Sequence, residues 1–219
     1  MHPTVRTLLA GFQAFARRGW LSRASLRSRL NDSARQALLR MMPKDSICAE
    51  IGVWEGEFSQ RILHTVQPRR LHLIDSWQYQ GDETYQLAWY GRRAGSQAHM
   101  DALYGTVCRR FQREAEAGQV VIHRQSSGEA AGGYPDGYFD WVYVDGNHLY
   151  EFVRRDLDLY APKIKIGGYL AGDDYAEGGW WQGGVKRAVD EFLESGHHCR
   201  MVWLRGRQFV LQMGRDAPT

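Results

Sequence analysis

The stretch FDWVYVDGNHLYEFVRRDLDLYAPKIKIGGYLAGDDY, residues 139–175, decides the fold class of this chain. Residues 139–145 and 167–173 are mainly apolar runs that predict buried strands, and residues 149–159 between them predict a helix. A strand, a helix and a further strand in succession place two parallel strands in one sheet. The stretch therefore indicates an α/β fold.

The same alternation continues on both sides of this stretch. We predict further elements over residues 46–52 (strand), 57–66 (helix), 70–75 (strand), 98–116 (helix), 120–124 (strand), 184–195 (helix), and 199–204 and 207–213 (strands joined at Gly206). Together they predict a Rossmann-like, mostly parallel sheet of seven strands with helices on both faces. The C-terminal hairpin is expected to add an antiparallel strand at the edge of the sheet.

The N-terminal part of the chain differs in charge from the rest. Of the 219 residues, 43% are hydrophobic and 24% charged, which is typical of a globular protein, and the net charge is +3. Residues 1–40 contain eight arginines and one acidic residue, a net charge of +7, so the remaining residues carry −4. We therefore predict an N-terminal helical arm, residues 1–43, and one α/β domain, residues 44–219.

The arm has an amphipathic pattern, because Leu8, Phe12 and Phe15 recur at helical spacing. Such a helix can pack on the domain or on a second subunit, which would give a homo-oligomer; a transit peptide and a membrane-surface helix are the alternatives. No apolar run approaches the roughly 18 residues of a membrane span, so stable membrane insertion is not expected. Three cysteines without a paired motif favour reduced thiols and a cytoplasmic protein.

Residues 50–56, EIGVWEG, close the first predicted strand and open a helix. Gly52 and Gly56 allow a sharp turn and the close approach of a ligand. Trp54 stands where a dinucleotide-binding turn needs a second glycine, which disfavours a diphosphate. A ligand with a cationic amino-acid end suits this turn better, since Glu50 offers a carboxylate. A purely structural turn is the alternative.

Two further strand ends carry groups that suit a nucleoside. Asp75 ends the second predicted strand, where a carboxylate can accept hydrogen bonds from both ribose hydroxyls. Ser126 and Ser127 follow the third strand and could bond an adenine edge, although such residues also form ordinary turns. An amino-acid end, a ribose and an adenine without phosphate are the parts of S-adenosylmethionine, which we predict as the cofactor.

Acidic residues end the next two predicted strands. Asp145 follows one strand, Asp173 and Asp174 follow its neighbour, and three carboxylates at one sheet edge repel one another unless a positive charge lies among them. An all-oxygen set favours a hard cation such as Mg²⁺, Mn²⁺ or Ca²⁺. The alternative is that Asp174 forms a turn and Asp145 accepts backbone hydrogen bonds. His148, close to Asp145 in the chain, could accept a proton from an oxygen bound to the cation.

Four segments resemble class I S-adenosylmethionine-dependent methyltransferases of the macrocin O-methyltransferase type: AEIGVWEG (49–56), LIDSW (73–77), residues 135–175 and GVKRAVDEF (184–192). The resemblance implies a cofactor site at Glu50, Gly52, Trp54, Gly56 and Asp75, with Asp145 also beside the cofactor. It implies magnesium, or manganese, at Asp145, Asp173 and Asp174, and a general base at His148. Two positions depart from the usual pattern, since Ile166 replaces a proline and relatives vary at the position of Asp173.

The reaction that this resemblance implies is transfer of a methyl group to a hydroxyl of a small molecule, a sugar or a glycosylated natural product. A catechol-type phenol O-methyltransferase and a non-catalytic scaffold that binds the cofactor are the alternatives. Aromatic residues over 77–90 and Trp180–Trp181 could stack on an acceptor or pack a loop. Nucleic acid is not expected as a partner, because the α/β domain is net acidic.

Overall fold

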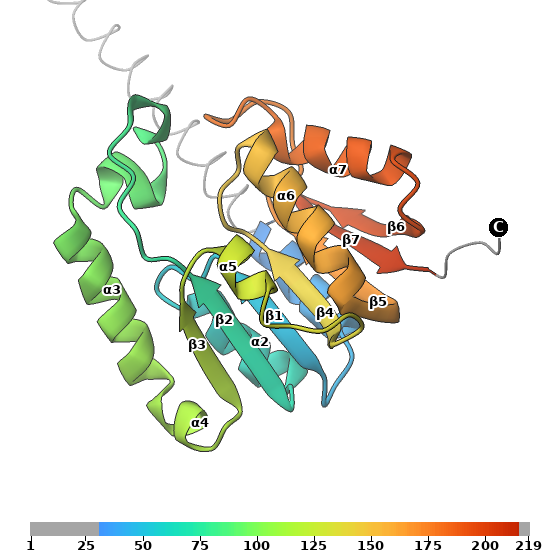
Figure 1. Ribbon diagram of the computed structural model, residues 1–219, viewed down its shortest axis with the longest axis horizontal. Helices are drawn as coiled ribbons and strands as arrows, with labels where there is room; N and C mark the ends of the chain where they lie inside the picture. The colour runs from blue at the N-terminus through green and yellow to red at the C-terminus, as the bar shows by residue number, and fades with distance from the viewer. Residues whose placement is uncertain (1–30, 215–219) are drawn as a thin grey trace, which may run out of the picture.

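The computed structural model describes residues 31–214, which form one sheet covered by helices on both faces (Figure 1). The strands are β1 (Ile47–Ile51), β2 (Arg70–Asp75), β3 (Val120–Arg124), β4 (Phe139–Val144), β5 (Ile164–Gly172), β6 (Cys199–Arg205) and β7 (Gln208–Met213). Their order across the sheet is β3-β2-β1-β4-β5-β7-β6, with β1 to β5 pairing in parallel and β7 antiparallel to both of its neighbours. The predicted seven-stranded, mostly parallel sheet is confirmed. The antiparallel strand lies one place inside the edge, because β6 forms the edge itself.

The helices follow the predicted alternation with strands. They are α2 (Glu57–Val66), α3 (Gln97–Arg110), α4 (Gln112–Glu116), α5 (Ser127–Ala131), α6 (Tyr150–Tyr160) and α7 (Gly184–Glu194), with the short elements η1 (Glu83–Tyr85), η2 (Trp89–Arg93) and η3 (Ala161–Lys163). The single helix predicted over residues 98–116 is divided into α3 and α4 at Phe111, which is buried. The five-residue helix α5 was not predicted, since its sequence SGEAA is too short to show a period.

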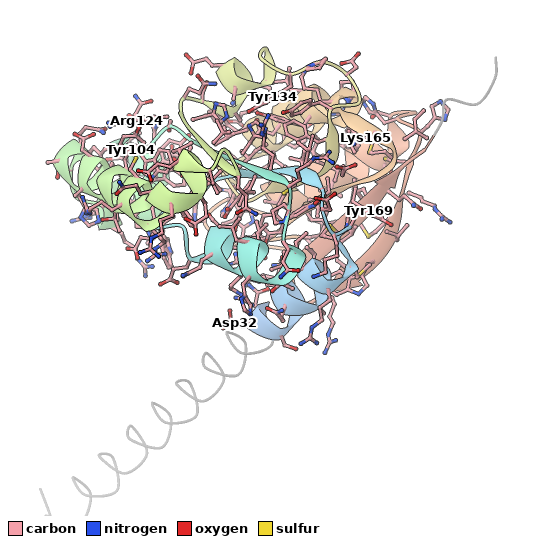
Figure 2. All side chains as sticks on the ribbon, turned by 90° about the horizontal axis from the view of Figure 1, so that it is seen from below. Asp32, Tyr104, Arg124, Tyr134, Lys165 and Tyr169 are labelled. Atoms are coloured by element: carbon pink, nitrogen blue, oxygen red, sulfur yellow. The ribbon has the colours of Figure 1, made fainter. Side chains whose placement is uncertain are left out.

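Side chains alternate between two apolar layers, one on each face of the sheet. In β4, Val142 and Val144 belong to the layer that α5, α6 and α7 cover. Trp141 and Tyr143 belong to the layer on the other face, with residues of α2 and α3. Figure 2 shows side chains on both faces, with Tyr134 toward one face and Asp32 toward the opposite one. This burial on both faces explains why the central strands read as continuous apolar runs.

The described end of the predicted arm is part of the core. Residues 31–41 are helical, and Leu38, Leu39 and Met42 are buried in the same layer as α2. Side chains also join this helix to α2, because Gln36 donates a 3.1 Å hydrogen bond to Thr65. The packed core therefore begins well before residue 44, where the predicted domain begins. The amphipathic pattern of Leu8, Phe12 and Phe15, and the subunit contact predicted from it, lie outside the described residues.

Among residues 31–214, no helix is both long enough and apolar enough to cross a membrane.

Two histidines and two tyrosines form a polar cluster within the layer under α5. His72 on β2 and His123 on β3 bond to each other at 3.0 Å, and the Tyr134 hydroxyl lies within hydrogen-bonding distance of both rings. Tyr138 lies 3.2 Å from the other nitrogen of His72. Burial lowers the pKa of His72 to about 4, with further lowering by His123 and Arg70. The fold therefore holds His72 neutral.

We predict that the free energy of unfolding falls as the pH falls from about 6.5 toward about 4. In that window the unfolded chain binds a proton at residue 72 and the folded chain does not, so the stabilisation present above pH 6.5 is lost on acidification. The contribution of His72 to this loss is roughly 3 kcal/mol. Urea unfolding of the wild type and of His72→Asn at several pH values measures it.

The control variant for this prediction is His64→Asn, because His64 is exposed on α2. His64→Asn should keep the pH dependence of the wild type, whereas His72→Asn should flatten it. Equal pH slopes for the wild type and His72→Asn would show that the His72 cluster does not control acid stability.

Candidate functional site

The turn after β1 lies against the end of β4. Gly52 has a φ of 89°, and a Cβ added to it would overlap the carbonyl carbon and oxygen of Asp145. Trp54 also has a positive φ, and Gly56 caps the start of α2 with a φ of 77°. Only glycine combines this backbone conformation with so close an approach. The predicted turn therefore exists, and Gly52 brings it into contact with Asp145.

Asp75 lies at the end of β2 and holds this turn in place. Its Oδ2 accepts backbone N–H groups of Val53 at 2.9 Å and Trp54 at 3.1 Å, and its Oδ1 accepts that of Trp77 at 2.8 Å. Burial raises the pKa of Asp75, against the lowering effect of these hydrogen bonds. A carboxylate offers about four acceptor positions, so about one remains beside the three in use. Asp75 thus has room for one ribose hydroxyl rather than the two that we predicted, unless the turn moves.

We predicted that Glu50 offers a carboxylate to a ligand, but its side chain faces helix α2. Its side chain is buried, and it accepts a hydrogen bond from Ser59 on α2. Burial raises the pKa of Glu50 to about 8; Ser59 lowers it and the carboxylate of Asp145 raises it further. Burial therefore favours the neutral form of this carboxyl group, and its role toward a cationic ligand stays a prediction.

Ser126 and Ser127 have structural partners in this protein. Ser126 caps α5, and its hydroxyl and backbone form a capping box with Glu129. The Ser127 hydroxyl donates to the buried carboxylate of Asp156 on α6. Both hydroxyls thus have partners within the fold, and their predicted contact with an adenine stays a prediction.

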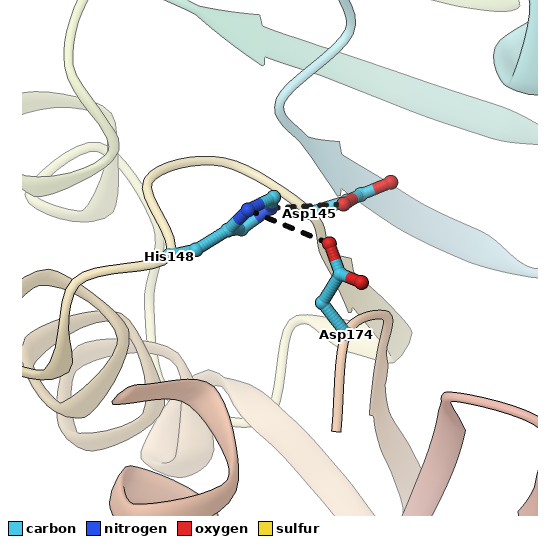
Figure 3. Close-up of side chains that lie close together, drawn as sticks. All are labelled: Asp145, His148 and Asp174. Atoms are coloured by element: carbon cyan, nitrogen blue, oxygen red, sulfur yellow. Dashed lines mark hydrogen bonds and ion pairs between the residues drawn. The ribbon is translucent and has the colours of Figure 1, made fainter. Parts of the chain in front are cut away.

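Asp145, His148 and Asp174 meet at the carboxyl ends of β4 and β5 (Figure 3). Nε2 of His148 lies 3.3 Å from Oδ1 of Asp145, and Nδ1 lies 3.5 Å from Oδ2 of Asp174. Burial lowers the pKa of His148, but the carboxylates of Asp145, Asp174 and Asp173 outweigh this effect and raise it. The imidazole therefore lies between two acceptors that favour its protonated form.

Asp173 lies apart from this cluster, although we predicted it as a metal ligand. Its side chain is only 4% exposed, and its Oδ2 accepts two N–H groups of Arg35 and one of Asn31. Its Oδ1 accepts the backbone N–H of Asp174 at 2.6 Å. Both oxygens thus have partners in the protein, and the acids that lie together with His148 are Asp145 and Asp174.

Two arginines of the site were missed by the sequence analysis. Arg35 donates from Nη2 to Oδ2 of Asp145 at 2.7 Å as well as to Asp173, and Arg207 donates to Oδ1 of Asp174 at 2.9 Å. A signal for Arg35 existed, since it precedes Leu38, Leu39 and Met42 by three, four and seven residues and so shares their buried helix face. Arg207 lies in a short turn between strands and has no such signal.

Aromatic rings from two loops surround His148. Trp180 and Trp181 lie 6.0 and 5.0 Å from its ring, between centroids. Tyr85 and Tyr90, from the loop after β2, contact Trp180 at 5.8 and 6.2 Å. The Tyr90 hydroxyl and the Trp181 indole nitrogen are buried without a hydrogen-bond partner. Such unpaired groups are available to a polar ligand at the rim.

The residues at the rim fit a divalent cation in part. One ligand atom from each of Asp145, His148 and Asp174 lies within 4.8 Å of the others, and Mg²⁺ is commonly held by only one or two carboxylates plus water and substrate. Asp173 is not one of these three residues, and its Oδ2 pairs with Arg35. A cation site here would therefore rest on Asp145 and Asp174.

The fold and a family comparison agree on the class of this protein. Residues 49–175 match a family described as a methyltransferase domain, and the chain belongs to that family. Its seven-stranded sheet is shared with solved methyltransferase structures. The macrocin type of the sequence resemblance is not distinguished by this match. No curated protein matches the chain.

Solved structures with this fold include proteins of several activities. The O-methyltransferase NovP is 22% identical with a TM-score of 0.61, over 83% of this chain and 80% of its own. A putative caffeoyl-CoA O-methyltransferase from Staphylococcus aureus is 14% identical with a TM-score of 0.52, over 82% and 80%. The putative methyltransferase SMU.1697c from Streptococcus mutans, solved with S-adenosylhomocysteine, is 12% identical with a TM-score of 0.51, over 84% and 96%. At these identities the likeness concerns the fold.

We predict that Gly52→Ala weakens binding of S-adenosylhomocysteine at least about tenfold, a cost of about 1.4 kcal/mol. The added methyl group would overlap the Asp145 carbonyl and push the turn away from β4. Gly137→Ala is the matched control, because Gly137 also has a positive φ, of 65°, but has open space around its Cβ position. Calorimetry at a temperature at which both variants are folded compares them. Equal affinities in the two variants would place the cofactor elsewhere.

Proposed function

We propose that this protein transfers the methyl group of S-adenosylmethionine to a hydroxyl oxygen of a small molecule, with a divalent cation, Mg²⁺ or Mn²⁺, as aid. The acceptor would carry two neighbouring hydroxyls, as a sugar or a glycosylated natural product does. The observation that carries the proposal is the convergence of Asp145, His148 and Asp174 within 4.8 Å beside the Gly52 turn. The likeness to NovP, an O-methyltransferase, supports the same reaction.

The cofactor is assigned to the turn between β1 and α2. Asp75 and Gly52 fix this turn, the first through two backbone hydrogen bonds and the second through its contact with Asp145. A methyl group held there would face the rim at Asp145. Because transfer is in line, the main task of the protein is to position the acceptor oxygen against the methyl carbon.

His148 is assigned as the residue that accepts the hydroxyl proton. Contacts with Trp180 and Trp181 and with two carboxylates fix its ring at the rim. When bound, the cation would orient two acceptor oxygens, lower the pKa of the hydroxyl, and replace the charge of protonated His148 between Asp145 and Asp174. A neutral imidazole can then take the proton.

We predict that a chelator abolishes methyl transfer and that Mg²⁺ or Mn²⁺ restores it. Asp174→Asn should raise the metal concentration for half-maximal activity at least about tenfold, because it removes one of two charged oxygen ligands.

His148→Gln should lower the chemical rate about 10²–10⁴-fold and leave cofactor affinity intact. Mass spectrometry with isotope-labelled cofactor, over panels of sugars, glycosides and catechols, identifies the acceptor and then measures these rates.

The control variant replaces a histidine outside the site. His64→Gln alters an exposed histidine in the last turn of α2, which is not one of the three clustered residues, and should keep the wild-type rate. Full activity in excess chelator would refute the cation's role. Unchanged rates in His148→Gln would assign the proton acceptor to another group.

A further inference from the structure

The three acids at the rim differ in what holds them, which the sequence pattern does not show. One oxygen of Asp145 accepts a hydrogen bond from Arg35, and one oxygen of Asp174 accepts from Arg207. The other oxygen of each carboxylate faces His148. Both oxygens of Asp173 accept hydrogen bonds within the protein. Its Oδ2 accepts from Arg35 and Asn31, and its Oδ1 accepts from a backbone N–H. Only two of the three acids thus present an oxygen to the cluster.

Arg35 reaches the rim from a helix that is fixed independently of it. Residues 31–41 are anchored through buried Leu38 and Leu39, and the guanidinium lies 5.2 Å from the ring centre of Phe58 on α2. A hydrogen-bonded chain, Asn31 to Gln208 to Tyr143, links the same helix to β7 and β4. The planar guanidinium can therefore hold two carboxylates in a set geometry, which a flexible ammonium cannot do.

The charges at the rim support a role beyond packing. Three ionised carboxylates of Asp145, Asp173 and Asp174 would carry −3, and Arg35 and Arg207 supply +2. Removal of Arg35 would leave Asp173 with a buried, uncompensated charge and would free one oxygen of Asp145. Freed carboxylates of this kind are ligands for hard cations.

We propose that Arg35 is a positioning residue that decides which acids of the rim face a cation. Its guanidinium binds Asp173 and Oδ2 of Asp145, so that Asp173 is withheld and the cation-facing set is Oδ1 of Asp145 with Asp174. This inference rests on the proposed function for the presence of a cation. It makes the helix at residues 31–41 a part of the site.

The test uses Mn²⁺ alone as a probe, titrated into the full, cofactor-free chain and followed by electron paramagnetic resonance. In the wild type, Asp174→Asn should weaken Mn²⁺ binding at least about tenfold and Asp173→Asn less than about threefold. In the Arg35→Gln background, Asp173→Asn should weaken binding at least about tenfold, because Asp173 has become a ligand. Arg35→Gln by itself should tighten binding about five- to tenfold, since it removes a nearby positive charge.

Two further variants serve as controls. Arg35→Lys keeps the charge without the planar fork, so Asp173→Asn should weaken Mn²⁺ binding in that background as it does in Arg35→Gln. Arg40→Gln, on the exposed side of the same helix, should change nothing. In the wild-type background, an equal loss of Mn²⁺ affinity in Asp173→Asn and Asp174→Asn would overturn the inference. So would weaker binding in Arg35→Gln.

Failure of the proposed function can be recognised separately. If wild-type protein binds no Mn²⁺, the role of a divalent cation in the proposed function is refuted. The pairing of Arg35 with Asp173 is then tested in chelator by thermal unfolding of both single variants and the double variant. A double variant that melts no lower than the worse single variant supports the pairing, and additive shifts in melting temperature overturn it.

Discussion

Repulsion among the carboxylates at the ends of β4 and β5 is the constraint on which the rest of this site depends. Asp145, Asp173 and Asp174 lie at one rim because parallel pairing aligns the ends of their strands, with Val144 beside Gly172. The protein counters this repulsion with two arginines and a histidine from three different segments. Each of these positive side chains must be held in place by its own packing, because an exposed salt bridge by itself adds little to the stability of the fold. The rim therefore links the N-terminal helix, the turn before β7 and the start of α6.

The cofactor turn depends on the same rim through backbone contact rather than charge. Gly52 lies against the Asp145 carbonyl, and Asp75 orders the turn from the side of β2. A displacement of the β4 end would thus move both the turn and the carboxylate of Asp145. This shared backbone couples the turn proposed to hold the cofactor to the place where an acceptor is proposed to bind.

The sheet could be predicted from sequence because its strands are buried on both faces. Strand β3 and helix α2 have the predicted bounds, and the strand ends at Asp75, Asp145 and Asp173 differ from them by no more than one residue. Prediction from the hydrophobic pattern failed for segments in which apolar residues do not recur at a regular spacing. The five residues of α5 are too few, and β5 begins at Ile164 because it continues through Gly167 and Gly168, which read as a turn. The family resemblance was confirmed at the level of a methyltransferase domain.

The site was predicted less completely, because sequence places residues at strand ends but does not give their partners. Asp145, His148 and Asp174 were brought together as expected, whereas Glu50 turned inward to Ser59 and Asp173 turned to Arg35. Both departures have one cause, which is a hydrogen-bond donor from a helix on the α2 side of the sheet. Donors from such a helix engage one oxygen of Asp145 as well, but leave its Oδ1 toward His148. The number of acids at a strand end is therefore a poor guide to the number of ligands, and the donors opposite each acid decide the outcome.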